Sequence, residues 1–467
     1  MRELVFVFLA LVFMNKGYAQ NPNIIFILTD DLGYTDLGCY GNPYNETPNL
    51  DSLAKGGLLF TDAYSSSPVC SPSRAGLMTG KHPARIGLTN FLIGNRTDEE
   101  SPILPPDWQK FLPANELTLP EILKSRNYYT GMIGKWHLGN GEGQSPWDQG
   151  FDFSRSIGKN GLDYYNYSIF EDSYEKEFED NGTYYLTDRL TDYAIEFLEN
   201  KKEEEQPFFL FLSYSAPHVW LVPRGDKLSK YLKKYNRFND KYNPYYAAMI
   251  ESVDDGVGNI IKKLQEMGIL ENTLIIFTSD NGGVGLAEQG PIPTDLQPLK
   301  KWKGHNYEGG IRVPLIAFWK GRISEERVSD LPTSNIDFFP SIAALVGVPV
   351  QHQLDGKNIL NHILDGAEEE RERPLFWHYP HFSNQLGRPS AAVRLGNWKL
   401  ILRYEDQGVE LYNLQEDIGE NNDLSSKEIE IKQRLFSLLL DWLKETNARL
   451  PLDKQTLEPI KIKRDLM

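Results

Sequence analysis

The chain has 467 residues, of which 24% are charged and 40% hydrophobic, and its formal net charge is −16. This composition is that of a globular protein, and the length allows one large domain with a smaller one beside it. The acidic excess argues against a nucleic-acid binder, which needs a basic face, and a count of two cysteines excludes a disulfide scaffold and a four-cysteine zinc site.

The N-terminus has the pattern of a secretory signal peptide. Arg2 precedes an unbroken apolar run over residues 4–14, which as a helix would reach about 16 Å, roughly half the hydrocarbon core of a bilayer. The small residues Gly17 and Ala19 fit cleavage after Ala19. We therefore expect residues 1–19 to be removed, and we expect an exported protein, periplasmic or secreted, without a membrane span. The alternatives are an uncleaved anchor and a buried first strand.

Short apolar runs alternate with amphipathic segments along most of the chain. The runs that predict buried parallel strands lie at 23–29, 129–134, 207–213, 273–278 and 313–319. The patterns that predict helices lie at 117–126, 187–200 and 245–267. Strands that alternate with helices predict a doubly wound α/β fold, in which a large parallel or mixed sheet carries helices on both faces. We assign residues 20–366 to this domain.

The pattern changes after about residue 366. Short strands are expected at 391–394, 398–404 and 409–414, because glycine-containing turns separate them, and an amphipathic helix is expected at 429–443. Together they predict a small antiparallel sheet with one helix, packed against the larger domain, over residues 367–467.

Ionisable or metal-binding side chains follow four of the expected strands: Asp30 and Asp31, Lys135 and His137, His218, and Asp280 and Asn281. Ligand sites in open α/β sheets lie outside the carboxyl ends of the strands, so we expect these groups to meet. Each alone could be an ordinary turn or capping residue. Three carboxylates beside one amide oxygen would repel one another without a cation, and such hard oxygen donors suit calcium or magnesium better than zinc.

The sequence CSPSRAGLMTG at residues 70–80 is the most specific motif of the chain. Taken alone, Cys70 could be a small buried residue or a thiolate nucleophile beside Arg74, but neither explains the neighbouring proline and arginine together. The pattern C-x-P-S-R-x-x-L-M-T-G resembles the signature of the type I sulfatases, in the alkaline phosphatase superfamily. In that family a formylglycine-generating maturation enzyme reads the motif and oxidises the cysteine to formylglycine (3-oxoalanine), an aldehyde.

The resemblance covers nearly all of the chain beyond the expected signal peptide. The segments that resemble the family occur in its order: PNIIFILTDDLGYTDLGCYG (22–41), GKWHLG (134–139), SAPH (215–218), TSDNGG (278–283), KGHNYEGGIRVP (303–314) and VELYNLQEDIGENNDL (409–424). Matches in this order are far more specific than any single short motif.

The resemblance also implies roles for the matched residues. The ligands that it implies for a calcium ion are Asp30, Asp31, Asp280, Asn281 and the modified Cys70. It further implies that Arg74, Lys135 and Lys303 bind the sulfate group. His218, with Lys303 nearby, is then the candidate general acid for the leaving alcohol, and His137 is the candidate base for the release of sulfate.

The C-terminal part contains side chains that commonly bind sugars. The segment 377–384 and Arg388 offer aromatic faces, imidazoles, an amide and a guanidinium. The residues that we expect to contact substrate are His305, His378, His381, Asn384 and Arg388, and ordinary packing beneath the C-terminal sheet is the alternative. These groups favour a carbohydrate sulfatase, similar to exported bacterial enzymes that act on sulfated polysaccharides. A phosphate or phosphonate monoester hydrolase with the same site, and a non-catalytic sulfated-glycan binding protein, are the other functions considered.

Overall fold

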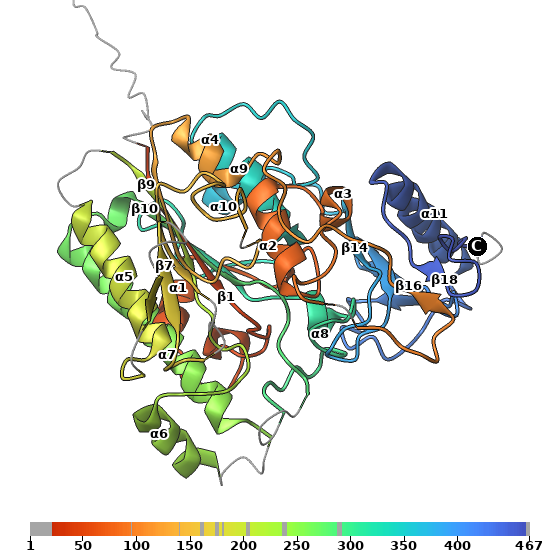
Figure 1. Ribbon diagram of the computed structural model, residues 1–467, viewed down its shortest axis with the longest axis horizontal. Coiled ribbons are helices and arrows are strands. Elements are labelled where there is room, and N and C mark those ends of the chain that lie inside the picture. Colours follow the sequence, from red (N-terminus) through yellow and green to blue (C-terminus); the bar gives the residue numbers. More distant parts are fainter. Residues whose placement is uncertain are drawn as a thin grey trace, which may run out of the picture.

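The computed structural model describes residues 21–94, 96–139, 141–158, 163–172, 177–179, 182–201, 206–235, 241–286 and 292–463. The expected signal peptide at 1–19 lies outside these residues. Figure 1 shows a large sheet with helices on both of its faces, and beside it a small sheet with one long helix. Among the described helices, none combines the length and apolar composition that crossing a bilayer requires.

The large sheet is mixed and mostly parallel at its centre. Its strands are β1 (Asn23–Thr29), β2 (Leu58–Phe60), β5 (Tyr129–Gly134), β6 (Phe153–Ile157), β7 (Ser168–Glu171), β8 (Glu177–Glu179), β9 (Phe208–Ser213), β10 (Thr273–Ser279), β11 (Leu315–Phe318) and β12 (Arg327–Ser329). The described strands lie in the order β12-β2-β11-β10-β1-β9-β5-β6-β7-β8. Strands β10, β1, β9, β5 and β6 are parallel, whereas β11 runs antiparallel to β10.

Helices cover both faces of this sheet (Figure 1). One face carries α1 (Pro48–Lys55), α5 (Leu186–Asn200) and α7 (Pro244–Glu266), and the other carries α2 (Cys70–Thr79), α4 (Leu119–Lys124), α9 (Phe338–Leu345) and α10 (Leu360–Asp365). Shorter or peripheral helices are α3 (Pro83–Ile86), α6 (Gly225–Tyr235) and α8 (Glu308–Ile311), with 3-10 turns at Gly38–Tyr40, Leu270–Asn272 and Asn335–Asp337.

The central strands are apolar throughout because both of their faces are buried. Ile24 and Phe26 of β1 pack in one core with α2, α4 and α9, while Ile25 and Ile27 pack in the other with α5 and α7. All four side chains are at most 1% exposed. Since successive side chains of a strand point to opposite faces, an unbroken apolar run is what a strand between two helical layers requires.

The predicted doubly wound α/β architecture is confirmed, but one strand direction was wrong. The run at 313–319 was expected to be a parallel strand, and β11 instead pairs antiparallel with both β10 and β2. The apolar run that identified it reports burial on both faces, which is the same for either strand direction. The other four expected strands are parallel members of the sheet, with bounds within one residue of those predicted.

The small sheet is antiparallel, as the turns had indicated. It contains β14 (Pro374–Tyr379), β15 (Ser390–Leu395), β16 (Trp398–Arg403) and β17 (Val409–Asn413), and α11 (Ile429–Glu445) packs on it. Two further strand pairs join β3 (Ala63–Tyr64) to β13 (Thr333–Ser334), and β4 (Ile103–Leu104) to β18 (Leu452–Asp453). Strand β14 was not predicted, because its residues had been assigned to a substrate-contacting segment. The division of the chain at residue 366 stays a prediction.

A buried ionic cluster joins the small sheet to α8. The Lys399 side chain is 0% exposed and lies 2.8 Å from Glu308 and 2.9 Å from Glu420. Glu420 also accepts a hydrogen bond of 2.7 Å from the backbone N–H of Glu308. Buried charges persist only when paired in this way, so the cluster fixes the small sheet against the segment that begins at Lys303.

We expect the substitution Glu420→Gln to flatten the pH dependence of stability. Burial, opposed by Lys399 and assisted by Glu308, raises the pKa of Glu420 to about 7. The folded protein therefore holds this proton more tightly than the unfolded chain, whose glutamates titrate near about 4.3. The free energy of unfolding should then fall as the pH rises from about 4 to about 7, and a neutral glutamine side chain at this position should remove about 3 kcal/mol of that fall.

Urea unfolding at pH 5 and pH 8 measures this difference directly. The control is Glu416→Gln, an exposed glutamate in the same loop, which should leave the pH dependence as it is in the wild type. An identical pH dependence in wild type and Glu420→Gln would show that the carboxyl of Glu420 titrates normally in the folded state.

Candidate active site

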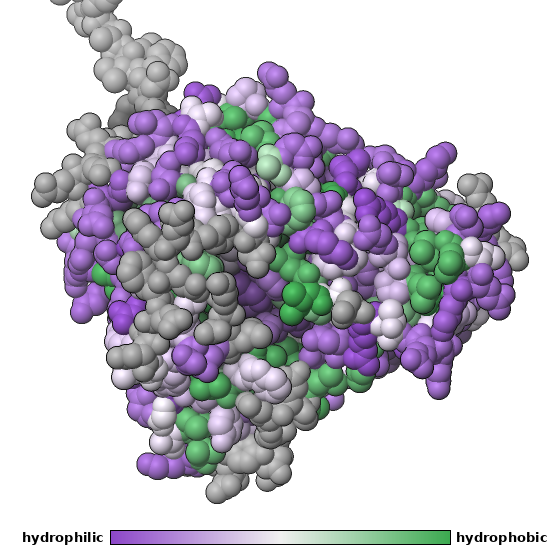
Figure 2. Space-filling model, in the orientation of Figure 1, coloured by the Kyte–Doolittle hydropathy of each residue, from purple (hydrophilic) through white to green (hydrophobic). Residues whose placement is uncertain are grey.

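The parallel strands end at one level and thereby gather the predicted side chains. Thr29 of β1 pairs with Ser279 of β10, and Leu28 pairs with Ser213 of β9, which in turn pairs with Gly134 of β5. The chemistry-bearing residues follow these strand ends directly: Asp30, Asp31, Lys135, His137, His218, Asp280 and Asn281. In Figure 2 the middle of the displayed face is hollowed, with a hydrophilic floor and hydrophobic atoms at its border, near where Figure 1 places the lower end of α2.

Cys70 is the first residue of α2 and is 3% exposed. Burial raises the pKa of its thiol, although Lys135 and Lys303 work in the opposite direction. Arg74 lies one turn further along the same helix and therefore faces the same side. The start of a helix carries partial positive charge from its free N–H groups, so this end of α2 suits a group that gains negative charge.

The Arg74 guanidinium connects three of the strand ends. Its Nε donates to Asp280 at 2.8 Å, and its Nη2 lies 2.8 Å from the same carboxylate oxygen. Its Nη1 donates to the carbonyl oxygen of Lys135 at 2.8 Å and to the hydroxyl of Ser213 at 2.6 Å. Arg74 is 1% exposed, so these contacts are dry and fix the relative position of α2 and the loops.

Two lysines form ion pairs with the carboxylates of Asp30 and Asp31, in the first loop of the site, which follows β1. Lys135 binds Asp30 through its Nζ, and Lys303 lies 2.7 Å from Asp31. Burial alone would lower the pKa of Lys303, but the charge of Asp31 outweighs it and raises that pKa. Burial would likewise raise the pKa of Asp30, but Lys135 and other basic neighbours lower it. The two ion pairs therefore bring two basic and two acidic side chains together within one small volume.

The acidic cluster fits a hard divalent cation. The Asn281 side chain donates from Nδ2 to Asp31 at 2.7 Å and to the Gly282 carbonyl at 2.9 Å, and its buried Oδ1 has no hydrogen-bond partner in the described part of the chain. Among the residues that the structure describes, the buried Oδ1 of Asp30 also has no hydrogen-bond partner. Burial and the charge of Asp30 raise the pKa of Asp280 to about 7 against the opposing charge of Arg74, as expected where buried carboxylates crowd together. Oxygen donors of this kind are those that calcium and magnesium prefer.

Close backbone packing sets the position of Lys303. A Cβ on Gly310 would collide with the carbonyl oxygen of His305, and a Cβ on Gly282 would collide with that of Gly309. The segment KGHNYEGG and the loop of Asn281 can approach each other this closely only because glycines occupy these positions. The glycines of both motifs therefore allow the close backbone packing that positions Lys303.

Both predicted catalytic histidines reach the site. His218 follows β9, and its Nε2 lies 3.6 Å from Asp31. Burial lowers the pKa of His218 to about 4, against the opposing charges of Asp30 and Asp31. His137 follows β5 in the left-handed backbone region, with φ 59°, and its buried Nδ1 has no partner among the described residues. Burial and Lys135 hold the pKa of His137 well below its usual value.

The residues that were predicted to contact substrate lie in different parts of the structure. His378 lies in β14, is 1% exposed, and uses both ring nitrogens inside the protein, with Tyr404 at 2.7 Å and the Arg449 carbonyl at 3.1 Å. Contrary to our expectation, its ring packs beneath the small sheet. Arg388 is half exposed, but ion pairs with Asp98 at 2.5 Å and with Glu405 already occupy its guanidinium.

The remaining three predicted contacts come from two segments, one that contains Lys303 and one that follows β14. His305 is 7% exposed and follows Lys303 by two residues in the chain. Its Nδ1 lies 3.0 Å from the Trp302 carbonyl. His381 is 1% exposed and pairs through Nε2 with Thr89 at 2.8 Å. Asn384 is exposed, at the turn that follows β14.

Two features of the site were missed from the sequence. Ser213 is the last residue of an apolar strand, where a serine attracts no notice, yet its hydroxyl holds Arg74. Tyr246 donates to the Asp31 carbonyl or to Asp36, with both oxygens at 2.8 Å, and so supports the first loop from α7. The only signal for Tyr246 was its place on the buried face of a predicted helix.

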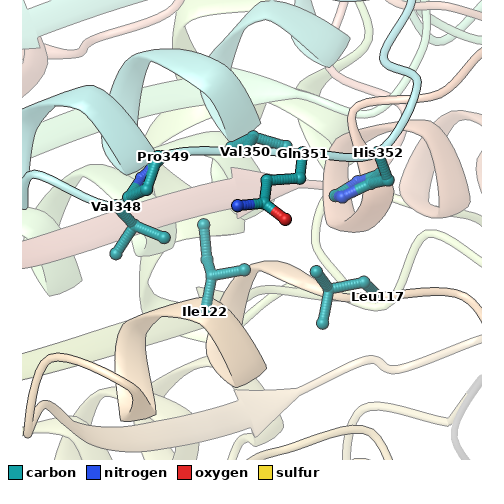
Figure 3. A pocket seen from close by; sticks show the side chains of 7 residues that line it. All are labelled: Leu117, Ile122, Val348, Pro349, Val350, Gln351 and His352. Carbon is teal, nitrogen blue, oxygen red and sulfur yellow. The ribbon is translucent and has the colours of Figure 1, made fainter.

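A separate hollow of about 270 Å³ lies between α4 and the segment that follows α9. Figure 3 shows Leu117 and Ile122 on one side of it, and Val348, Pro349, Val350, Gln351 and His352 on the other. None of the predicted site residues lines it, and its side chains are mainly aliphatic. It is therefore distinct from the candidate active site.

The family model for sulfatases matches residues 22–348. The chain belongs to the sulfatase family. A second model, described as N-sulphoglucosamine sulphohydrolase, C-terminal, matches residues 301–446 of this sulfatase. The protein is therefore a sulfuric ester hydrolase of the alkaline phosphatase-like superfamily, as the motif at Cys70 had indicated.

Individual relatives of the sulfatase match along most of its length. A protein named sulfatase from Formosa agariphila is 31% identical, over 93% of this chain and 90% of its own. Human arylsulfatase A is 35% identical, over 82% of this chain and 75% of its own. The crystal structure of Ps i-CgsB in complex with k-i-k-neocarrahexaose superposes with a TM-score of 0.79 at 31% identity, covering 91% of this chain and 93% of that one.

Proposed function

We propose that this sulfatase hydrolyses sulfate esters on a carbohydrate, with formylglycine formed from Cys70 and with a bound calcium ion. The observation that carries the proposal is the position of Cys70 at the start of α2, beside Arg74 and an all-oxygen cluster of three carboxylates and Asn281. A carbohydrate substrate is supported by the similar Ps i-CgsB, whose crystal structure holds a neocarrahexaose.

The residues present divide the chemistry among them. Asp30, Asp31, Asp280, Asn281 and residue 70 would hold the calcium ion, which would polarise the oxygen atoms bound to it. Hydrated formylglycine would supply an oxygen nucleophile toward sulfur.

Arg74, Lys135 and Lys303 would bind the sulfate oxygens and offset the negative charge that grows on them during the reaction. Ion pairs with Asp280, Asp30 and Asp31 already hold these cations beside the carboxylate cluster, so little reorganisation would be needed when the substrate enters. Water is excluded around them, since Arg74 is 1% and Lys303 6% exposed.

The two histidines would move protons at opposite stages. His218 would hold a proton at Nε2 for the oxygen of the leaving alcohol, because an alkoxide leaves poorly without one. The negative charge of an entering sulfate raises the pKa of His218, as Asp30 and Asp31 already do. His137, kept neutral by burial, would accept a proton at Nδ1 when sulfate is released.

The proposal includes two steps before catalysis. A formylglycine-generating enzyme would read the motif at residues 70–80 and modify Cys70, and the chain would be exported to the periplasm or the exterior of a bacterium. The apolar run at residues 4–14 and its small-residue cleavage pattern support export.

A comparison of two aryl esters tests the reaction class. We expect kcat/KM for 4-nitrophenyl sulfate to exceed that for 4-nitrophenyl phosphate by about 100-fold or more, a difference of roughly 3 kcal/mol in the transition state. The reverse order would favour the phosphate or phosphonate monoester hydrolase. No turnover of either ester or of any sulfated oligosaccharide, with sulfated-glycan binding intact, would favour the non-catalytic binding protein.

A further inference from the structure

A second hollow, of about 300 Å³, lies beside the small sheet and is lined by residues from two distant parts of the chain. Its walls include Asn90, Arg96, Trp108 and Lys110, and His381 closes it from the segment that follows β14. The volume is at the lower end of the roughly 300–1,000 Å³ found for small-molecule pockets. It is therefore suited to a group about the size of a sugar ring.

Short contacts connect this hollow to the reactive centre. Tyr379, at the end of β14, donates from its hydroxyl to Oδ1 of Asn90 at 3.1 Å. Burial raises the pKa of Tyr379, and electrostatic interactions with the Cys70 and Lys303 side chains also affect that pKa, so the three side chains lie in one neighbourhood. Gly304, the neighbour of Lys303, packs so closely on Ser383 that a Cβ would collide with the serine hydroxyl. One short segment, 379–383, therefore borders both the sulfate-binding cations and the hollow.

The lining has a charge opposite to that of the whole protein. Arg96 and Lys110 are its charged members, and none of the lining residues carries a carboxylate, although the net charge of the chain is −16. Burial and Lys110 hold the pKa of His381 well below its usual value, so its ring is neutral and the positive charge comes from the other two side chains.

Neither of these two positive charges is fully paired by other groups of the protein. Arg96 donates to the Asn384 carbonyl at 3.3 Å and forms no ion pair among the described residues. Lys110 stands 3.6 Å above the ring of Trp108, and its nearest carboxylate, the exposed Asp107, is 3.9 Å away. In contrast, Arg388 at the same edge is neutralised by two carboxylates. A guanidinium with free N–H groups beside an aromatic face is an arrangement that binds an oxyanion carried on a sugar.

We propose that this hollow binds a second anionic group of the substrate, a sulfate or a carboxylate, placed on the same sugar as the scissile sulfate or on its neighbour. The inference rests on the proposed function and narrows it, because the preferred carbohydrates then carry at least two negative groups. Arg96 and Lys110 bind the second group, and Trp108 packs against the sugar.

Binding to an inactive protein tests the proposal without depending on catalysis. Calorimetry on Cys70→Ala would compare matched probes that differ by one anionic group: glucosamine 6-O-sulfate with glucosamine 2-N,6-O-disulfate, neocarrabiose carrying one sulfate with neocarrabiose carrying two, and a sulfated uronate disaccharide with its carboxyl-reduced form. We expect at least one doubly charged probe to bind about tenfold more tightly than its partner. Which pair responds distinguishes a second sulfate from a carboxylate.

Substitutions assign the preference to the hollow. In the same background, Arg96→Ala with Lys110→Ala should remove the tenfold preference, and Arg96→Glu should reverse it. Both side chains are exposed, so the fold should tolerate each change. The matched control is Arg434→Ala, which removes one exposed positive charge from α11 and should keep the preference. Equal affinity within every pair, or a preference that survives the double substitution, overturns the proposal. An inactive wild-type enzyme with an intact preference would instead contradict only the catalytic function.

Discussion

Replacing Cys70 with alanine should lower kcat for 4-nitrophenyl sulfate by about 10⁴-fold or more, because the nucleophile of the proposed reaction derives from this side chain. The fold should be preserved, since Cys70 is small and 3% exposed, and alanine is compatible with the first turn of α2. Turnover and thermal melting of the same preparation separate the two effects.

The second thiol provides the control for this experiment. Both cysteines are free, and Cys39 is only partly buried, at a 3-10 turn that follows the loop of Asp30 and Asp31. Cys39→Ala should therefore keep activity within about twofold of the wild type. Mass spectrometry of the peptide that contains residue 70 should show a formylglycine-sized mass in the active wild type. Retained turnover in Cys70→Ala would defeat the catalytic assignment, whereas retained glycan binding would not.

The sequence was most informative where local pattern and strand topology agree. The apolar runs that end at Thr29, Gly134 and Ser213 identified parallel strands, and the rule that sites form at their carboxyl ends predicted that Asp30, Lys135 and His218 would meet. That prediction needed no knowledge of side-chain contacts. It depended only on the strand ends being level, which the observed register provides.

Features set by contacts between distant segments could not be predicted in the same way. The run at 313–319 indicated burial but not direction, so β11 was expected to be parallel. His378 and His381 looked equivalent in the sequence, but strand β14 turns the first into the interior, whereas the second reaches a hollow formed with residues 90–110. Arg96 and Lys110 belong to no sequence motif that would mark them. Only the folded chain places them beside the segment that follows β14.

The substitution Arg74→Lys should lower kcat by about 10²–10³-fold, although the positive charge is retained. The arginine uses the planar fork of its guanidinium, with Nε and Nη2 on Asp280 and Nη1 on Ser213 and the Lys135 carbonyl. An ammonium group is a single point of charge and cannot make these contacts together, so Asp280 and the groups proposed to bind sulfate would lose their fixed positions. Steady-state kinetics on 4-nitrophenyl sulfate would show whether the loss is in kcat, as expected for a transition-state contact, or in KM.

Arg85→Lys is the matched control, because it removes a comparable fork outside the site. Arg85 binds Asp355 through Nε at 3.0 Å and Nη2 at 2.6 Å, and its side chain is 16% exposed. Loss of that geometry should cost about 1 kcal/mol of stability and leave kcat unchanged. Arg74→Ala should be worse than either, by about 3–5 kcal/mol of stability, since it leaves Asp280 buried without its partner. If Arg74→Lys and Arg85→Lys lowered stability alike and neither changed kcat, Arg74 would be a structural residue and the sulfate-binding role would pass to Lys135 and Lys303.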